Sequence, residues 1–170
     1  SINLAEHVKN GRKGIFAYSI DWEKLRETVE FTVRWLDDVV DANKYVSAIP
    51  QLEEAAKRNR RIGVSIMGLA DLLYKIGVQY GSRKGIDCAG QLMEFIRHHT
   101  LRASNQLAQE RGAFPGVKGS RYDYSVQNIV VLKTKNIEPW NPPKPLYPYK
   151  HKFGMPKLDW KTLEADIKRY

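Results

Sequence analysis

A strand-to-helix joint lies near the middle of the chain, where the sequence reads Arg60-Arg61-Ile62-Gly63-Val64-Ser65-Ile66-Met67-Gly68-Leu69-Ala70-Asp71-Leu72-Leu73. Its first half is apolar and β-branched, which favours a short extended segment. After Gly68 the apolar residues adopt helical spacing, and we expect that helix to end near Gly77. Gly63 and Gly68 could cradle a phosphate at the helix start. The stretch lacks the Gly-Lys-Ser/Thr ending of a P-loop, so close packing of the joint is the favoured interpretation.

Helical periodicity dominates on both sides of this joint. Upstream, we expect one helix from the N-cap Asp21 to about Asp41 and a shorter one from Pro50 toward Asn59. Downstream, the longest helix should run from the cap Ser82 to the stop Gly112. The buried stripe of the first helix is expected to contain Trp22, Leu25, Val29, Val33, Leu36 and Val40, widened by Phe31, Trp35 and Val39. The stripe of the longest helix is expected to contain Ile86, Ala89, Met93, Ile96, Thr100, Ala103 and Leu107.

The composition changes after residue 112. Seven of the eight prolines lie in residues 113–158, so we expect a loop-like insertion there, with Ile129–Thr134 as one edge strand and an extended run from Pro142 to Pro145. A capped helix should open at Asp159 and be cut off at Tyr170. The predicted organisation is a helical portion (1–112), a basic, proline- and aromatic-rich insertion (113–158) and the start of a truncated helix (159–170).

Length and composition restrict the class of protein. The 170 residues are 42% hydrophobic and carry a net charge of +9, which suits one ordinary globular domain that can contact polyanions. The apolar runs are too short to cross a bilayer, and the beginning of the chain lacks the layout of a signal peptide. A single cysteine cannot form an internal disulfide or a cysteine-based zinc site, so a cytoplasmic location is expected.

Two groups of residues on the long helix could carry chemistry. Cys88 could be a nucleophile, yet it lies beside the apolar stripe with no base nearby in the sequence, so a half-buried core position is favoured. His98 and His99 are adjacent and point about 100° apart on a helix, so they cannot bind one metal as an i,i+4 pair does. We expect both histidines to be solvated or capping.

An acidic cluster ends the first predicted helix. Asp37, Asp38 and Asp41 could hold a divalent ion, but a solvated face is favoured, with Arg34 pairing with Asp37 or Asp38. No metal site is therefore predicted.

The insertion mixes basic and aromatic residues in a way that suits single-stranded nucleic acid, which binds by stacking and charge. The residues concerned are Arg121, Lys135, Lys150 and Lys152 with Tyr122, Tyr124, Tyr147 and Tyr149. A nucleic-acid-binding helical module is therefore one hypothesis. An ordered surface insertion used for subunit or domain contacts is an equally good interpretation.

Four blocks in order carry a family resemblance: Ser1-Ile2-Asn3-Leu4-Ala5, the joint at residues 60–73, Ala103 to Pro115, and Asp159-Trp160 with a helix ending in Lys168-Arg169-Tyr170. In this order they resemble the large catalytic subunit of ribonucleotide reductase. Met67 to Leu73 is most similar to the adenosylcobalamin-dependent class II enzymes. The resemblance covers nearly the whole chain except residues 121–157, which look enlarged.

The resemblance implies a ten-stranded α/β barrel, of which this chain would be a mainly α-helical slice with a few short strands. It implies that the parent enzyme reduces ribonucleoside di- or triphosphates by radical chemistry, with adenosylcobalamin as the cofactor. No cofactor is expected on this fragment itself. The implied partners are the remainder of the reductase chain, the ribonucleotide substrate and a second copy of the parent, with no membrane.

The resemblance assigns no catalytic residue to this chain. The cysteine-bearing finger loop and a reducing cysteine would lie before Ser1, and the substrate-phosphate loop would follow Tyr170, so we expect an excised or intein-flanked fragment that is inactive alone. Cys88 matches none of the working cysteines of the family. Ser1 and Asn3 are the residues expected beside the substrate pocket, with structural support as the equal alternative. Ser65 stands where a second glycine is expected, which weakens a phosphate role for Gly63.

Overall fold

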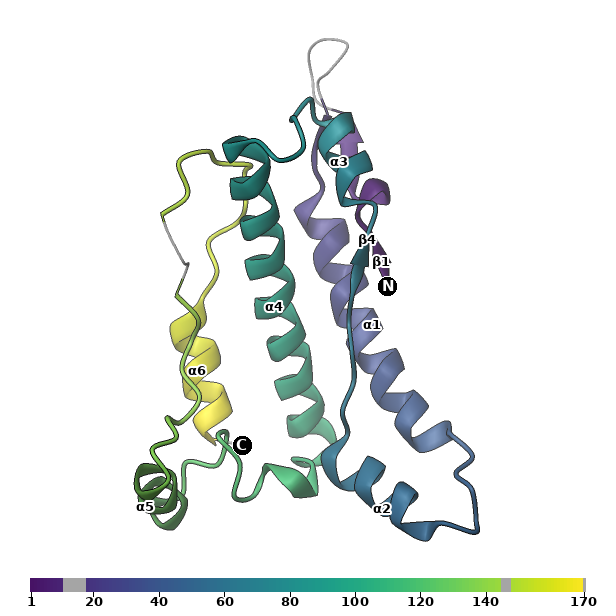
Figure 1. Ribbon diagram of the computed structural model, residues 1–170, viewed down its shortest axis with the longest axis vertical. Coiled ribbons are helices and arrows are strands. Elements are labelled where there is room, and N and C mark those ends of the chain that lie inside the picture. Colours follow the sequence, from purple (N-terminus) through teal and green to yellow (C-terminus); the bar gives the residue numbers. More distant parts are fainter. Residues whose placement is uncertain (11–17, 145–147, 170) are drawn as a thin grey trace. The chain divides into compact units, whose positions relative to one another are not determined.

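The computed structural model describes residues 1–10, 18–144 and 148–169, in which helices predominate and strands are short (Figure 1). The helices are α1 (Trp22–Ala42), α2 (Pro50–Asn59), α3 (Leu69–Lys75), α4 (Arg83–Arg111), α5 (Val126–Thr134) and α6 (Trp160–Arg169), with 3-10 helices η1 (Leu4–Glu6) and η2 (Pro115–Val117). The strands are β1 (Ile2–Asn3), β2 (Val8–Asn10), β3 (Tyr18–Ile20) and β4 (Ile66–Met67). The mainly helical character and the short strands agree with the prediction.

The chain forms two compact units, each assembled from separate stretches. Unit 1 contains Ser1–Thr32, Val64–Thr100 and Lys144–Leu158, and unit 2 contains Val33–Gly63, Leu101–Pro143 and Asp159–Tyr170. Both long helices, α1 and α4, begin in unit 1 and end in unit 2. The described strands and α3 belong to unit 1, whereas α2, α5 and α6 belong to unit 2.

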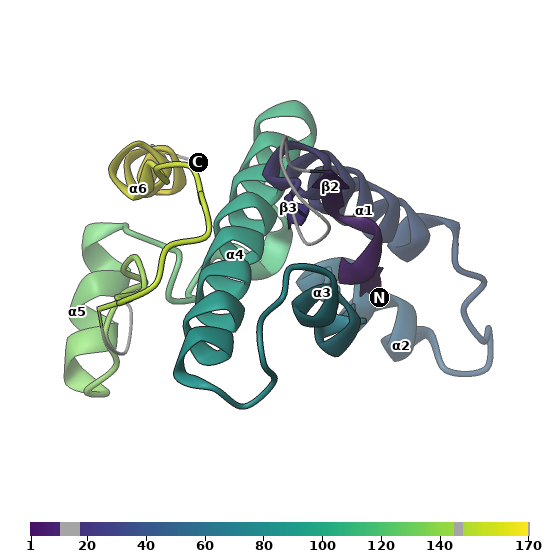
Figure 2. The same ribbon diagram turned by 90° about the horizontal axis from the view of Figure 1, so that it is seen from above.

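Unit 1 contains two small sheets. Strand β1 pairs in parallel with β4, with Ile2 opposite Ile66 and Asn3 opposite Met67. Parallel strands need a long crossover, and here α1 and α2 lie between the two strands in the sequence. Strands β2 and β3 pair antiparallel, and β3 leads directly into α1 (Figure 2).

The core of unit 1 is formed by apolar residues from the strands, α1, α3 and α4. Its buried members are Ile2, Leu4, Ile20, Trp22, Leu25, Val29, Leu72, Leu73, Val78, Cys88, Leu92, Phe95 and Ile96. Trp22, Leu25 and Val29 confirm the narrow stripe predicted for α1. The prediction that Phe31, Trp35 and Val39 widen this stripe is wrong, because Phe31 and Trp35 are 70% and 57% exposed and Val39 is also exposed.

On α4 the buried stripe lies beside the predicted one. Ile96, Ala103 and Leu107 are buried as expected, but Ile86 and Met93 are each 45% exposed. The stripe runs instead through Cys88, Leu92 and Phe95, the residues that contact the core of unit 1. Side chains at neighbouring helix positions point about 100° apart around the axis. Periodicity alone therefore did not determine which of two adjacent faces of α4 is buried.

The helix ends follow the predicted capping chemistry. Asp21 accepts the Lys24 N–H at 3.3 Å at the start of α1, and Ser82 accepts the Gly85 N–H at 3.0 Å at the start of α4. Pro50 begins α2 as expected. Gly112 ends α4 with φ +86°, a left-handed conformation that suits glycine.

The strand predicted at Ile129–Thr134 is wrong, because these residues belong to α5. Ser125 caps this helix through the Asn128 N–H, and the Asn128 side chain donates to the carbonyls of Ser120 and Asp123 at 2.8 and 2.9 Å. This local polar network outweighs the β preference of the Ile-Val-Val run. The insertion is thus partly helical.

Of the predicted features, Pro145, Tyr147 and Tyr170 lie outside the described residues.

None of the helices that the structure describes is both long and apolar enough to span a membrane.

Candidate functional site

The parallel pair β1·β4 brings the first residues of the chain to the central joint. Ser1 Oγ lies 2.7 Å from Ser65 Oγ, and the Ile2 N–H donates to the Ser65 carbonyl at 2.8 Å. Asn3 Oδ1 accepts the Ala5 N–H at 3.2 Å and thereby caps η1. The two predicted pocket residues, Ser1 and Asn3, therefore lie at the joint, and the side chain of Asn3 has a structural role there.

Gly68 makes the joint possible. Its φ of +71° is left-handed, and a Cβ atom at this position would lie 2.3 Å from Asn3 Oδ1. The close-packing interpretation is thus confirmed for Gly68. It fails for Gly63, where a Cβ would meet no atom within 4 Å.

A buried histidine, which the sequence analysis did not single out, fixes the same region. His7 is 4% exposed, with Nδ1 2.8 Å from the Asn3 carbonyl and Nε2 2.9 Å from Thr28 Oγ1 on α1. Lys75, at the end of α3, donates to the Ala5 carbonyl at 2.8 Å. These bonds connect β1 and η1 to two helices, so the position of the β1 backbone is set from several sides.

Asp87 and Gln91 bind the last part of the insertion, around residues 150–153, to α4. The buried Asp87 carboxylate accepts the backbone N–H groups of Lys150 and His151 at 3.1 and 3.0 Å, and its Oδ2 lies 2.9 Å from His151 Nδ1. Gln91 donates to the His151 carbonyl at 2.8 Å and accepts the Phe153 N–H at 3.2 Å. The sequence-based prediction missed this contact, for which the available signal was two polar residues one turn apart on an otherwise buried helix face.

The pKa of Asp87 reflects two opposing causes. Burial raises the pKa of this carboxyl, but the hydrogen bonds from His151 and Lys150, with the charge of Arg83, outweigh burial and hold the pKa below its usual value. The charged carboxylate is therefore the form that holds the segment in place.

The remaining candidates on α4 are structural. Cys88 is fully buried, more so than predicted, and burial raises the pKa of its thiol to about 12. A nucleophilic thiolate is therefore excluded at neutral pH. The solvated role predicted for His98 and His99 was wrong, since each is only 5% exposed. His99 packs its ring against Phe95 at 4.4 Å and lies 3.3 Å from Glu30 Oε1.

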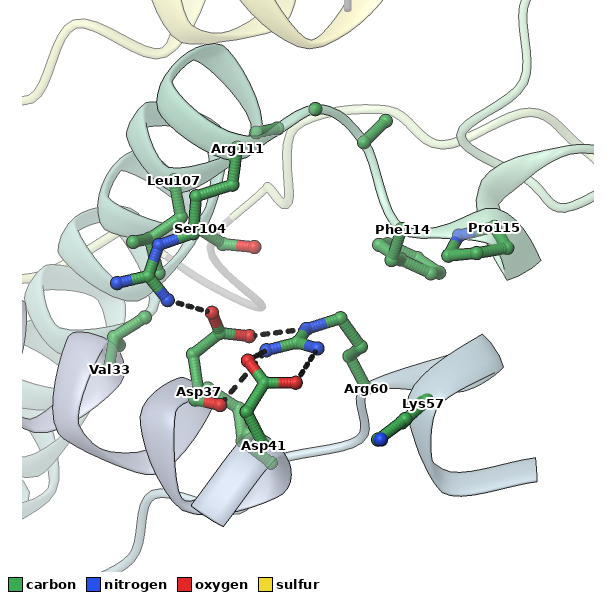
Figure 3. A pocket seen from close by; sticks show the side chains of 14 residues that line it. Val33, Asp37, Asp41, Lys57, Arg60, Ser104, Leu107, Arg111, Phe114 and Pro115 are labelled. Atoms are coloured by element: carbon green, nitrogen blue, oxygen red, sulfur yellow. Dashed lines mark hydrogen bonds and ion pairs between the residues drawn. The ribbon is translucent and has the colours of Figure 1, made fainter. Parts of the chain in front are cut away.

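Unit 2 contains a chain of ion pairs between α1, the end of α2 and the end of α4 (Figure 3). Arg60 donates to Asp37 at 2.8 Å and to both oxygens of Asp41 at 2.8 and 2.7 Å. Arg111 donates to Asp37 at 2.8 Å and pairs with Asp38 at 2.7 Å.

The solvated face predicted for these aspartates is wrong for Asp37, whose side chain is only 13% exposed, whereas Asp38 and Asp41 are 53% and 54% exposed as expected. Arg34 was also expected to pair with Asp37 or Asp38, yet its partner is Glu110, at 2.7 Å. The hydrogen bond from Arg60 lowers the pKa of Asp41, and its own aspartate partners raise the pKa of Arg60. Arg60 has a left-handed φ of +43° at the end of α2, a conformation in which its side chain reaches both aspartates.

These ion pairs form one wall of a cavity of about 430 Å³. Figure 3 shows the charged side chains facing Phe114 and Pro115 across it. Val33, Ile62 and Leu107 supply apolar lining. Because the aspartates already bind arginines, they cannot also serve as free metal ligands, and the arginine charges are neutralised for an incoming anion.

A second cavity of about 180 Å³ in unit 2 is largely apolar and lined by Leu101, Ser104, Asn105, Ala108, Ala113, Phe114, Val117, Tyr122 and Ile167. Neither cavity has a histidine or cysteine in its lining. Over residues 1–10, 18–144 and 148–169, no group of three or more His, Cys, Asp or Glu side chains is arranged to hold a metal ion.

The aromatic residues of the insertion make internal contacts. Tyr122 stacks on the buried Trp140 with ring centroids 6.0 Å apart, and the Tyr124 hydroxyl donates to the Trp140 carbonyl. Tyr149 packs against Gly90 on α4. Rings held in this way do not form an open stacking platform, so the geometry gives the nucleic-acid-binding hypothesis no support.

Comparison with known proteins identifies the family of the chain. A family model described as "Ribonucleotide reductase, barrel domain" matches residues 1–170. The chain belongs to this family, which confirms the resemblance drawn from the four sequence blocks.

Three individual relatives show how similar the chain is to named reductases. The chain is 43% identical over 122 residues to the vitamin B12-dependent ribonucleoside-diphosphate reductase of Mycobacterium tuberculosis, covering 72% of this chain and 16% of that protein. It is 40% identical over 123 residues to the Thermoplasma acidophilum protein of the same name, covering 72% of this chain and 15% of that protein. The ribonucleoside-diphosphate reductase subunit alpha of Chlamydia trachomatis is 37% identical over 133 residues, covering 78% and 12%. The chain thus spans only a small part of each relative.

Proposed function

We propose that this chain is part of the catalytic chain of a vitamin B12-dependent ribonucleoside-diphosphate reductase and is inactive alone. The observation that carries the proposal is the family match over all 170 residues, together with relatives whose names specify the B12-dependent enzyme. The same names favour a diphosphate over a triphosphate substrate. The chain's one cysteine supports inactivity, because Cys88 is buried with a raised thiol pKa.

Within the whole enzyme, unit 1 would supply two adjacent parallel strands of the barrel and the helices that cover them. Ser1 and Asn3 would lie beside the substrate pocket, with Asn3 also holding the turn at η1. The partners of the chain would be the remainder of the reductase polypeptide, the ribonucleotide and a second copy of the parent protein.

Adenosylcobalamin would be the cofactor of the parent enzyme, where its cobalt–carbon bond supplies the radical. The two cavities described in unit 2 do not fit this group. The cavities of unit 2 offer cobalt no nitrogen or sulfur ligand from histidine or cysteine, and the larger one has a wall of mutually paired charges. The cofactor would therefore be held outside these two cavities.

The test compares the full-length protein with the 170-residue chain. We expect the full-length protein to convert CDP to dCDP only when adenosylcobalamin and a dithiol are both supplied, and the isolated chain to form no dCDP. Reduction of CDP by the isolated chain would show that it is a complete enzyme. Full-length activity without adenosylcobalamin would contradict the B12-dependent assignment.

A further inference from the structure

The two-stranded sheet β1·β4 has one face on the core and one face away from it. Ile2 is 3% exposed in the core, and its partner Ile66 packs against the same core. Side chains alternate along a strand, so Ser1 and Ser65 lie on the opposite face, as does Met67, which is 54% exposed. Among the described residues, the helices of unit 1 therefore leave one face of the sheet uncovered, and that face carries a pair of hydroxyl groups.

Membership in a barrel-domain family indicates whether this open face is the inner or the outer face of the barrel. In a barrel whose helices form the outer ring, the sheet face away from the helices is the inner face. The chain belongs to a barrel-domain family. In the whole protein, Ser1, Ser65 and Met67 would therefore face the interior of the barrel.

The hydroxyl pair has unused hydrogen-bonding capacity. With the oxygens 2.7 Å apart, one hydroxyl donates to the other, and the second retains its own proton for another acceptor. The ladder bond from the Ile2 N–H to the Ser65 carbonyl fixes the two strands in this register. The pair is thus held in place before any ligand arrives.

The chemistry of the pair favours a sugar hydroxyl over a phosphate. A hydroxyl pair can both donate and accept, which matches a ribose hydroxyl, whereas phosphate oxygens only accept and are commonly bound by cations or helix N-termini. Among the described residues, no cationic side chain is bonded to Ser1 Oγ or Ser65 Oγ. Ser65 stands where the family resemblance predicts a glycine, which has no hydroxyl.

The geometry points to Ser65, paired with Ser1, as a substrate-contacting residue that binds a ribose hydroxyl of the nucleoside diphosphate. This inference rests on the proposed function and adds to it the residue, the group it contacts and the side of the sheet from which contact is made. Met67, on the same face, would provide an apolar neighbour to the sugar.

The experiment uses the full-length reductase with Ser65→Ala, and with Ser65→Thr as the variant that keeps the hydroxyl. The control is Ile66→Val, on the same strand and the opposite face. Binding of ADP and of inorganic pyrophosphate is measured by equilibrium dialysis, and the thermal unfolding midpoint shows whether each variant folds. We expect Ser65→Ala to bind ADP about 3- to 10-fold more weakly, the range for one neutral hydrogen bond. Pyrophosphate affinity should be unchanged, and Ser65→Thr and Ile66→Val should bind ADP like the wild type.

The double variant Ser1→Ala with Ser65→Ala should lose no more affinity than Ser65→Ala alone, because the pair acts as one unit. Unchanged ADP binding by folded Ser65→Ala in an active reductase would overturn the inference and leave the proposed function intact. An equal loss for pyrophosphate would show that the contact is with phosphate and overturn the sugar assignment. A wild-type full-length protein that neither binds ADP nor reduces CDP would overturn the proposed function, and the inference with it.

Discussion

Replacing Gly68 with alanine tests how β1 is held against α3. A non-glycine residue in the left-handed conformation costs about 1–2 kcal/mol. The new Cβ would also lie 2.3 Å from Asn3 Oδ1, which must move and give up its bond to the Ala5 N–H. Loss of a capping bond costs about 0.5–2 kcal/mol. We expect Gly68→Ala to lower the free energy of unfolding by about 2–4 kcal/mol.

Gly77 provides the matched control. Its φ of +68° is nearly the same, but a Cβ there would meet no atom within 4 Å. Gly77→Ala should therefore cost only the backbone strain of about 1–2 kcal/mol. Urea unfolding of the purified chain, followed by circular dichroism, measures both variants.

Asn3→Ala completes a double-mutant cycle with Gly68→Ala. With the amide side chain removed, the principal clash at Gly68 disappears, so the double variant should lose less stability than the sum of the two single variants. Strict additivity, or equal costs for Gly68→Ala and Gly77→Ala, would refute the proposed close contact between Gly68 and Asn3.

Three further outcomes are expected. Asp37→Ala removes a carboxylate that is only 13% exposed and is shared by two arginines, so it should lower the free energy of unfolding in a urea titration by about 2–3 kcal/mol. Arg34→Ala removes one member of an exposed ion pair and should lower the same free energy by less than about 1 kcal/mol. The pKa of Asp87 in the folded protein lies below the ordinary 3.8. The stability that its charged carboxylate contributes is therefore complete above pH 3.8 and is lost as the pH falls through the folded-state pKa. Asp87→Asn should remove this part of the acid dependence of the unfolding midpoint, measured between about pH 2 and 6. Cys88, with a pKa of about 12, should resist a thiol reagent at pH 8 until urea unfolds the chain, and rapid labelling of the native protein would contradict its burial.

The long helices and their ends could be predicted from the sequence because their signals are local. The caps Asp21 and Ser82 and the stop Gly112 lie where the pattern placed them. The orientation of the buried stripe on α4 could not be predicted, since Ile86 and Cys88 both suit an apolar face and only tertiary packing decides between them.

The errors in the candidate sites have a common physical cause. The Ile-Val-Val run of α5 favours a strand by propensity, but Asn128 and its carbonyl partners fix a helix. The buried histidine His99 and the partners of Asp37 depend on contacts with residues distant in the sequence, such as Glu30 and Arg111. Family resemblance predicted Ser1 as a residue beside the substrate pocket, and only the structure showed that its hydroxyl lies against that of Ser65.

The interleaving of the two units has a consequence for synthesis on the ribosome. Unit 1 needs Lys144–Leu158 and unit 2 needs Asp159–Tyr170, so each unit is completed only by a stretch that is translated after α5. Domains built from one continuous stretch can fold one after another as they emerge. Here the stretches that complete the two units both follow α4, so the units cannot fold one after the other, and no single cut in the gene would release either unit intact.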